Sequence, residues 1–141
     1  MHNTIIKFGY PITLIKEYKS WVVLLRPKQV TIGSLIIICK ENAISLPTVT
    51  ENAFFEFHSV LQDVERLLKG KFNPDKINYL ALMMVDNHVH FHVIPRYADS
   101  IKVNNIFYDD KHWPNPPVLT DCIDIKEGQF KLLLNQCINL V

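Results

Sequence analysis

The sequence predicts an α+β fold: an antiparallel sheet of about five strands, one long helix and a shorter C-terminal helix. Three observations support this prediction. Runs rich in β-branched and aromatic residues, separated by polar residues, Gly and Pro, indicate strands in both halves of the chain. One long stretch of helical periodicity lies between these strands, and a second ends the chain. Strands that do not alternate regularly with helices favour antiparallel pairing.

Three strands are expected before the long helix. They cover residues 12–18 (ITLIKEY), 20–27 (SWVVLLRP) and 33–40 (GSLIIICK). A polar turn separates the first two, and Pro27 and Gly33 bracket the connection between the second and the third.

The long helix is expected over residues 51–69. Thr50 is a suitable N-cap, Glu51 places an acidic residue in the first turn, and Gly70 stands where a C-cap glycine would. A stripe at helical spacing indicates that this helix packs on the sheet. The stripe consists of Phe54, Phe57, Val60, Leu61, Val64, Leu67 and Leu68.

Two more strands are expected after this helix. Residues 76–85 (KINYLALMMV) form one, and Asp86-Asn87 is interpreted as a tight turn into a strand with three histidines, so that the two strands form an antiparallel hairpin. Residues 104–122 are polar, aromatic and rich in proline, which predicts an extended surface segment. A short helix is expected over residues 126–140.

The composition narrows the classes of partner. With 141 residues, the chain has the size of one domain that can bury a hydrophobic core. Its net charge of +1 gives no long-range field to gather a nucleic acid polymer or an anionic membrane. The first residues lack the apolar region and cleavage site of a signal peptide, and the longest apolar run, Leu35–Cys39, is too short to cross a bilayer.

The cysteines indicate a reducing compartment. Cys39, Cys122 and Cys137 form no Cys-x-x-Cys pair, and an odd number without secretory features favours free thiols. A cytoplasmic location is therefore expected. Cys39 ends an apolar run and is interpreted as a small core residue.

The stretch VDNHVHFHVIPRY, residues 85–97, holds histidines at alternate positions. In a strand, successive side chains point to opposite faces, so His88, His90 and His92 would share one face, about 6.6–7 Å apart. The apolar residues between them would face the helix over residues 51–69. The imidazoles would be left on the open face of the sheet.

Such a row allows three interpretations. In a metal site, histidines at i and i+2 can chelate one ion, but the third lies about 13 Å from the first, and further ligands must come from elsewhere. As exposed residues without a role, three alternating histidines are hard to explain. In nucleophilic catalysis on phosphorus, the central histidine attacks, one neighbour fixes its tautomer and the other donates to the phosphate or the leaving oxygen. Only the last interpretation uses all three residues.

The segment HVHFHVI, residues 88–94, resembles the signature of the histidine triad (HIT) family of nucleotide hydrolases and transferases, and it matches at every position. The PRY that follows resembles the bacterial and diadenosine-polyphosphate-hydrolase-like branches. RPKQVTIGSLIIICK, residues 26–40, is similar to an earlier strand–turn–strand segment of the family. The resemblance defines a HIT domain over residues 5–98, and it leaves residues 99–141 as a C-terminal extension that packs on the same domain or on a dimer partner.

The resemblance implies a five-stranded sheet with a long helix, usually in a homodimer, and chemistry without a metal or other cofactor. His90 would attack the α-phosphorus of a nucleotide and form a nucleotidyl-histidine intermediate. His88 would orient His90, and His92 would contact the phosphate or the leaving group. A nucleoside monophosphate, expected to be AMP, would be released from diadenosine polyphosphates or adenylylated conjugates. The nucleoside would lie near residues 24–26.

The sequence departs from the family pattern at three places. Ser34 stands where the family usually has a histidine; serine can hydrogen-bond but carries no charge. A Gly-rich phosphate loop is replaced by MMVDNHV, in which Asn87 offers one donor and Asp86 would repel a phosphate. Arg26 stands where Asp or Asn often contacts the ribose, and arginine suits phosphate better. Ser34, Asn87 and Arg26 are nevertheless predicted to contact substrate.

Two further residues are predicted to contact substrate. Trp113, in His112-Trp113-Pro114, resembles a C-terminal tryptophan motif that reaches the partner's site, although an aromatic surface anchor fits equally well. Arg96 is either a phosphate contact or a solvated charge at the strand end. Two alternatives to the enzyme remain: a non-catalytic nucleotide-binding sensor, and a metal-dependent hydrolase built on the histidine cluster.

Overall fold

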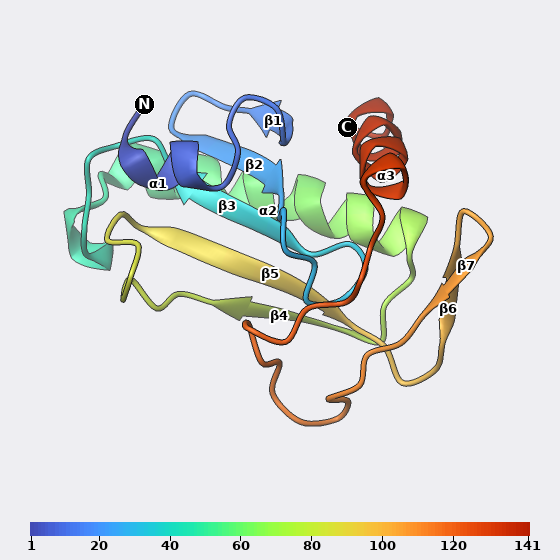
Figure 1. Cartoon of the computed structure of the whole chain (residues 1–141). Helices are drawn as coiled ribbons and strands as arrows, with labels where there is room; N and C mark the ends of the chain where they lie inside the picture. Colours follow the sequence, from blue (N-terminus) through green and yellow to red (C-terminus); the bar gives the residue numbers. More distant parts are fainter.

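A five-stranded antiparallel sheet forms the centre of the computed structural model, which describes residues 1–141 (Figure 1). The strands lie in the order β1-β2-β3-β5-β4, so β1 and β4 are the edges of the sheet. The predicted α+β fold with about five antiparallel strands is confirmed. The strands are β1 (Leu14–Glu17), β2 (Trp21–Leu25), β3 (Leu35–Cys39), β4 (Lys76–Leu80) and β5 (His90–Arg96).

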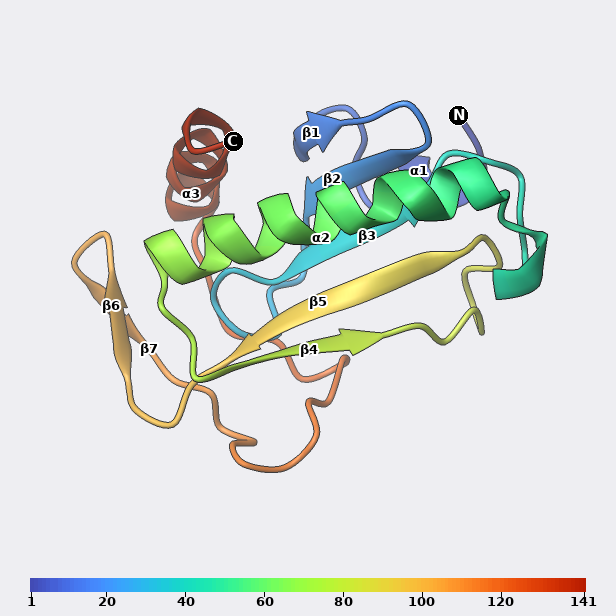
Figure 2. The same cartoon turned by 180° about the vertical axis from the view of Figure 1, so that it is seen from behind.

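The long helix α2 (Glu51–Lys71) packs on one face of the sheet, behind it in Figure 1 and in front of it in Figure 2. A short 3-10 turn, η1 (Leu46–Thr48), precedes it. The predicted N-cap is confirmed, because the Thr50 hydroxyl accepts a hydrogen bond from a backbone N–H of the first turn. The predicted end at Gly70 is wrong: the helix continues to Lys71, which brings its C-cap residue Phe72 into the core.

The main hydrophobic core lies between α2 and the sheet. Trp21, Ile37 and Val93 enter it from three neighbouring strands, and Val64 and Leu68 enter it from the helix. All five side chains are almost completely buried. This packing confirms that the apolar stripe of α2 faces the sheet.

The opposite face is covered by an N-terminal segment that the sequence did not indicate. A short helix, α1 (Asn3–Lys7), lies in front of the sheet in Figure 1. Ile5 and Phe8 form a second, smaller apolar cluster with strand residues of that face, namely Val22, Leu24, Ile36 and Ile38. The registers pair Ile36 with His92 and Ile38 with His90, so this is also the histidine face. The prediction that the imidazoles lie on an open face is therefore wrong.

The connection between β4 and β5 also differs from the prediction. The two strands pair in antiparallel fashion, but β4 ends at Leu80 rather than at residue 85, and residues 81–89 link it to β5. The predicted tight turn at Asp86-Asn87 is wrong. The linking residues turn toward α1, where the Asp86 carboxylate accepts a hydrogen bond from the Lys7 ammonium group at 2.7 Å.

The chain after β5 is more ordered than predicted. Instead of an extended segment throughout residues 104–122, β6 (Ile101–Val103) and β7 (Ile106–Tyr108) form a small antiparallel hairpin. Asn104 and Asn105 form its turn with φ values of 51° and 66°. Two consecutive residues in the left-handed region are characteristic of a two-residue hairpin turn, and asparagine tolerates that conformation.

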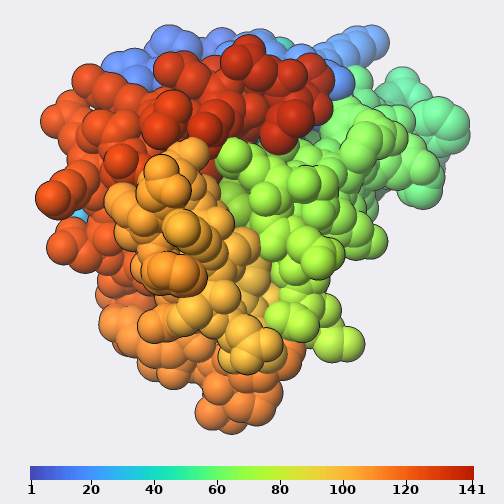
Figure 3. Space-filling view, turned by 90° about the vertical axis from the view of Figure 1, so that its right-hand side faces the viewer, coloured from blue at the N-terminus to red at the C-terminus, as the bar shows by residue number.

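The C-terminal helix α3 (Glu127–Asn139) is confirmed, and it packs against β1. Leu133, Leu134 and Cys137 add to the main core. Figure 3 shows the hairpin, α3 and the end of α2 side by side. Gln136 hydrogen-bonds Lys71 of α2 and Asn104 of the hairpin turn. No helix of the chain is both long and apolar enough to span a membrane.

Candidate active site

Strand β5 presents His90 and His92 to the α1 side of the sheet. Their ring centroids are 5.0 Å apart and their planes are nearly perpendicular. The ring of Phe8 lies 6.0 Å from each of them. Only 2% of His90 and 6% of His92 is exposed, because α1 and Phe8 cover this part of the sheet. The two imidazoles therefore lie in a protected site.

A cavity of about 350 Å³ opens beside these two histidines. Four segments far apart in the sequence contribute to its wall: the N-terminal segment, the residues after β2, the link between β4 and β5, and the tail before α3. The lining residues are Lys7, Phe8, Arg26, Lys28, Leu82, Met84, Val85, Asp86, His90, His92, Leu119 and Thr120. A cavity with an apolar wall and a few convergent polar groups is typical of a small-molecule site.

His90 has a defined tautomer. Its Nδ1 lies 2.6 Å from the backbone carbonyl oxygen of His88. A carbonyl oxygen only accepts hydrogen bonds, so Nδ1 must carry the proton. In the neutral ring, Nε2 is then left with its lone pair. Nε2 is the nitrogen available to a ligand in the cavity.

His92 has the opposite tautomer. The Arg26 guanidinium donates from Nε to Nδ1 of His92 at 3.3 Å. Because arginine only donates, the neutral His92 ring carries its proton on Nε2. Burial, and after it the neighbouring charges of Arg26 and His90, lower the pKa of His92 to about 4. Near neutral pH, His92 is therefore an uncharged hydrogen-bond donor beside the lone pair of His90.

Arg26, one of the residues predicted to contact substrate, lines the histidine cavity beside His92. It is almost completely buried, and its Nη1 donates to the carbonyl oxygen of Lys28 and contacts the Cys122 sulfur at 3.9 Å. Its Nη2 makes no hydrogen bond within the protein. The guanidinium thus orients His92 and keeps one donor group for a ligand.

His88 occupies a different position from the one predicted. It precedes β5, because the link from β4 is turned toward α1, and its ring does not line the histidine cavity. Its Nδ1 lies 3.1 Å from the Thr4 hydroxyl and its Nε2 lies 2.7 Å from the Asn42 side-chain oxygen. The contact that orients His90 comes from the backbone carbonyl of His88 and not from its imidazole.

His2 is a neighbour of the triad that the sequence did not reveal. Its ring stacks on that of His88, with centroids 3.8 Å apart and planes 3° from parallel. Its Nε2 lies 2.6 Å from the carbonyl oxygen of Cys39, whereas its Nδ1 is buried without a partner. Burial lowers the pKa of His2, which favours the neutral ring. His2 therefore joins the N-terminus to the end of β3.

Ser34 and Asn87 do not line the histidine cavity. The Ser34 hydroxyl donates to the carbonyl oxygen of Thr31 and accepts from the Thr31 N–H, so it closes the turn before β3. Asn87 lines a neighbouring hollow of about 260 Å³ together with His88. That hollow shares Lys7, Val85 and Asp86 with the histidine cavity.

Arg96 and Trp113 lie elsewhere in the monomer. Arg96 is buried, and its Nε donates to the carboxylate of Asp110 at 2.7 Å. Its remaining nitrogens donate to Asn78 and to the carbonyl oxygen of Asn115, so no donor group is left for a phosphate. Trp113 and Arg96 line a separate hollow along β4, and neither reaches the histidine cavity.

The side chains do not form a metal site. No group of three His, Cys, Asp or Glu side chains is arranged to hold an ion. Of the two cavity histidines, only His90 has a free lone pair, on Nε2, because Nε2 of neutral His92 carries the proton. Three protein ligands are the usual minimum for a catalytic zinc ion.

The most informative residues missed by sequence reasoning are Lys7, Phe8, Lys28 and Thr120. Lys7 and Phe8 lie far from the histidines in sequence, and no local pattern marks them as cavity residues. Asp86, which the sequence analysis noted as a carboxylate that would repel a phosphate, does line the cavity.

The fold and the site define a class of protein: a single α+β domain that holds two opposed imidazole tautomers at a small-molecule cavity. The HIT domain model matches residues 10–99, which contain both imidazoles and the whole sheet. The chain therefore belongs to the HIT family.

Solved histidine triad proteins share the fold. One from Sinorhizobium meliloti is 18% identical with a TM-score of 0.75, over 100% of this chain and 96% of that one. A hypothetical histidine triad nucleotide-binding protein from Sulfolobus tokodaii is 18% identical with a TM-score of 0.71, over 97% of this chain and 88% of that one. A zinc-bound histidine triad family protein from Mycobacterium smegmatis is 17% identical with a TM-score of 0.62, over 96% of this chain and 90% of that one. No curated protein sequence matches the chain.

Proposed function

We propose that this chain is a metal-independent nucleotide hydrolase or nucleotidyl transferase that acts at the α-phosphate and releases a nucleoside monophosphate, AMP. Its substrates would be diadenosine polyphosphates or adenylylated conjugates, as in the diadenosine-polyphosphate-hydrolase-like branch that the PRY after the triad resembles. The observation that carries the proposal is the hydrogen bond from Nδ1 of His90 to the His88 carbonyl oxygen. It directs the lone pair of His90 to Nε2, where a nucleophile is needed.

The neighbouring groups support the same chemistry. When Nε2 of His90 bonds to phosphorus, the ring becomes cationic, and the His88 carbonyl oxygen stabilises that charge through Nδ1–H. The Nε2–H of His92 can donate to a phosphate or leaving-group oxygen. Arg26 keeps His92 in this tautomer and supplies a positive charge next to the phosphate. In this proposal, Ser34, Asn87 and Arg96 act as supports of the surrounding loops, and any contact of Trp113 with substrate would be made across a dimer.

The first experiment measures AMP release from a panel of adenine nucleotides, with and without a chelating agent. Release that persists in the chelator supports the proposal. Release that the chelator abolishes would favour the metal-dependent alternative. Binding without any release would favour the nucleotide-binding sensor, which the carboxylate of Asp86 in the cavity makes a specific second candidate.

A substitution tests the assignment of the nucleophile. We expect His90→Ala to lower the rate of AMP release by at least about a thousandfold, because the covalent intermediate cannot form. Asn135→Ala is the control, since Asn135 is exposed on α3 and lines neither the histidine cavity nor the groove between α2 and β4. Comparable turnover in the two variants would contradict the role given to His90.

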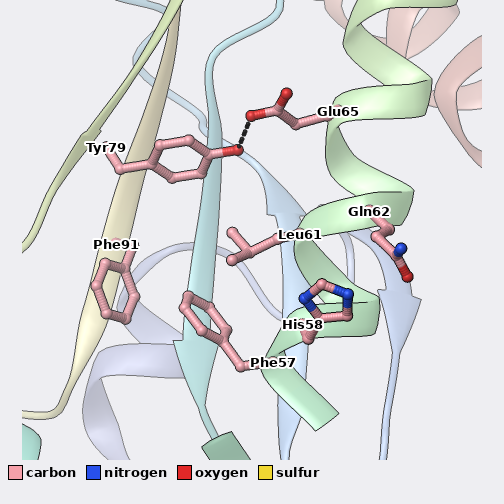
Figure 4. Close-up of a pocket in the computed structure, with 7 residues that line it drawn as sticks. All are labelled: Phe57, His58, Leu61, Gln62, Glu65, Tyr79 and Phe91. Carbon is pink, nitrogen blue, oxygen red and sulfur yellow. Dashed lines mark hydrogen bonds between the residues drawn. The ribbon is translucent and has the colours of Figure 1, made fainter. Parts of the chain in front are cut away.

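We also propose that the chain forms a homodimer through α2 and β4. An apolar groove of about 440 Å³ lies between these elements (Figure 4). Phe57, Leu61 and Phe91 form its floor, and the Tyr79 hydroxyl donates to Glu65 at 2.8 Å across it. β4 is also an edge strand, with one side unpaired. An apolar groove next to an open strand edge suits a second copy of the same surface.

Sedimentation velocity tests the dimer. We expect the wild-type chain to sediment as a dimer at micromolar concentration and Leu61→Asp to sediment as a monomer, because a carboxylate would be buried at the contact. Leu132→Asp, at an exposed position on α3, should stay dimeric. A monomeric wild-type chain, or dissociation only in the α3 variant, would contradict the proposal.

The three free thiols support a cytoplasmic location.

A further inference from the structure

The histidine cavity contains more positive charge than one phosphate requires. Lys7, Arg26 and Lys28 line it, and its only carboxylate belongs to Asp86. His92 is neutral near pH 7, because its pKa is lowered to about 4. The protein therefore places three cations against one anion around a cavity of about 350 Å³.

These charges lie at both ends of the histidine pair. Arg26 contacts His92 and marks the end of the cavity nearest His92, and Lys28, whose backbone carbonyl accepts from Nη1 of Arg26, lines the same cavity. Lys7 lies at the other end, because it borders the hollow that His88 lines. His90 stands between His88 and His92 along the chain. A ligand whose α-phosphorus lies at His90 thus has cationic groups on both sides.

Lys7 is held by a contact that a ligand can replace. Its ammonium group donates to Asp86 at 2.7 Å, with side-chain exposures of 54% for Lys7 and 17% for Asp86. An ion pair this exposed contributes little to stability, so an incoming phosphate with more than one negative charge can compete with the carboxylate. Both residues line the histidine cavity and the neighbouring hollow. Lys7 can therefore bind a polyphosphate that extends from the histidine cavity into the neighbouring hollow.

We infer that the leaving group of the substrate is itself a phosphate or polyphosphate, bound by Lys7 and Lys28, rather than an uncharged amine. This inference rests on the proposed function and narrows its two substrate classes to one. Lys7 and Lys28 are specificity-determining residues for the leaving group. Asp86 holds Lys7 in place until the anionic substrate binds.

The chemical step follows from this assignment. Nε2 of His90 bonds to the α-phosphorus as the bond from that phosphorus to the bridging oxygen breaks. The bridging oxygen keeps the electron pair and leaves as a terminal phosphate oxygen of a nucleoside polyphosphate, which needs no proton near neutral pH. Water then bonds to the same phosphorus, the phosphorus–nitrogen bond breaks with its electrons returning to Nε2, and a proton passes to solvent. Lys7 and Lys28 bind the negative charge that the polyphosphate already carries in the bound substrate, which an uncharged amine leaving group lacks.

The experiment compares two substrates, diadenosine tetraphosphate and adenosine 5′-phosphoramidate. We expect Lys7→Ala and Lys28→Ala each to raise the KM for diadenosine tetraphosphate by about three- to tenfold, with less effect on kcat. The KM for the phosphoramidate, whose leaving group is ammonia, should stay within about twofold. Lys7→Arg should restore most of the loss, because it keeps the charge. Asp86→Asn should lower the KM for the tetraphosphate, because Lys7 is released.

Lys69→Ala is the matched control, since Lys69 is similarly exposed and lies on α2 on the other face of the sheet. Equal effects of Lys7→Ala on both substrates, or no effect on either, would overturn the inference while leaving the nucleotidyl chemistry intact. If neither substrate releases AMP, the proposed function fails. Calorimetric titration of the protein with ATP and with AMP then tests the inference separately. A wild-type preference for ATP over AMP that Lys7→Ala removes supports it, and equal affinities overturn it.

Discussion

The two faces of the sheet differ in how completely they are filled, although the same strands build both. On the α2 face, side chains of the strands and helices form a core of 24 buried residues. On the α1 face, the apolar cluster has six residues, and the cavity remains beside it. β5 contributes Phe91 and Val93 to the first face and His90 and His92 to the second.

This difference separates stability from chemistry. The α2 face is held by apolar burial, which has no directional requirement and tolerates no polar group without a partner. The α1 face is held by directional contacts: Arg26 to His92, His90 to the His88 carbonyl, and His2 to the Cys39 carbonyl. We therefore expect the largest losses in the free energy of unfolding from substitutions on the α2 face. Substitutions on the α1 face should change turnover and cause smaller or pH-dependent losses of stability.

The largest expected effect on stability is on the α2 face. Leu68→Ala should lower the free energy of unfolding by about 2–5 kcal/mol, because Leu68 is fully buried and the cavity would not collapse completely. Urea denaturation measures this loss, and AMP release by the folded variant should stay close to that of the wild type. A large loss of turnover at temperatures where the variant is folded would show that the two faces are not independent.

The next effect is a pH dependence that arises from the α1 face. His92 has a pKa of about 4 in the folded chain and about 6.5 when unfolded, so the unfolded chain binds more protons between these values. The contribution of His92 to the free energy of unfolding is fully present above pH 6.5 and is lost as the pH falls toward 4. The loss is roughly 3 kcal/mol at most. Urea denaturation at a series of pH values measures the slope. His92→Asn should flatten it; an unchanged slope would assign the dependence to other groups.

The smallest effect concerns the N-terminus. His2→Ala removes the stack on His88 and the hydrogen bond to Cys39, which should lower the free energy of unfolding by about 1 kcal/mol. Hydrogen exchange should show faster opening of residues 2–8 than in the wild type. Asn135→Ala, on α3, is again the control. An effect as large as that of Leu68→Ala would mean that the α1 face contributes to stability as the α2 face does.

The local sequence determined most of the sheet and both long helices. Period-two alternation places His90 and His92 on one face whatever surrounds them, and helical periodicity with a Thr50 cap defines the start of α2. The hairpin of β6 and β7 also has a local signal, Asn104-Asn105 between two runs of β-branched and aromatic residues, although the polar, proline-rich composition of residues 104–122 favours an extended segment.

Only the tertiary structure decided how the site is built around those two histidines. It placed α1 over them, turned residues 81–89 toward Lys7, separated His88 from the cavity and brought Arg26 to His92. These contacts join residues that lie far apart along the chain. They depend on strand register and on packing between segments, which no local propensity encodes. The alternation of histidines is a property of one strand, whereas their protonation, burial and charged neighbours are properties of the whole fold.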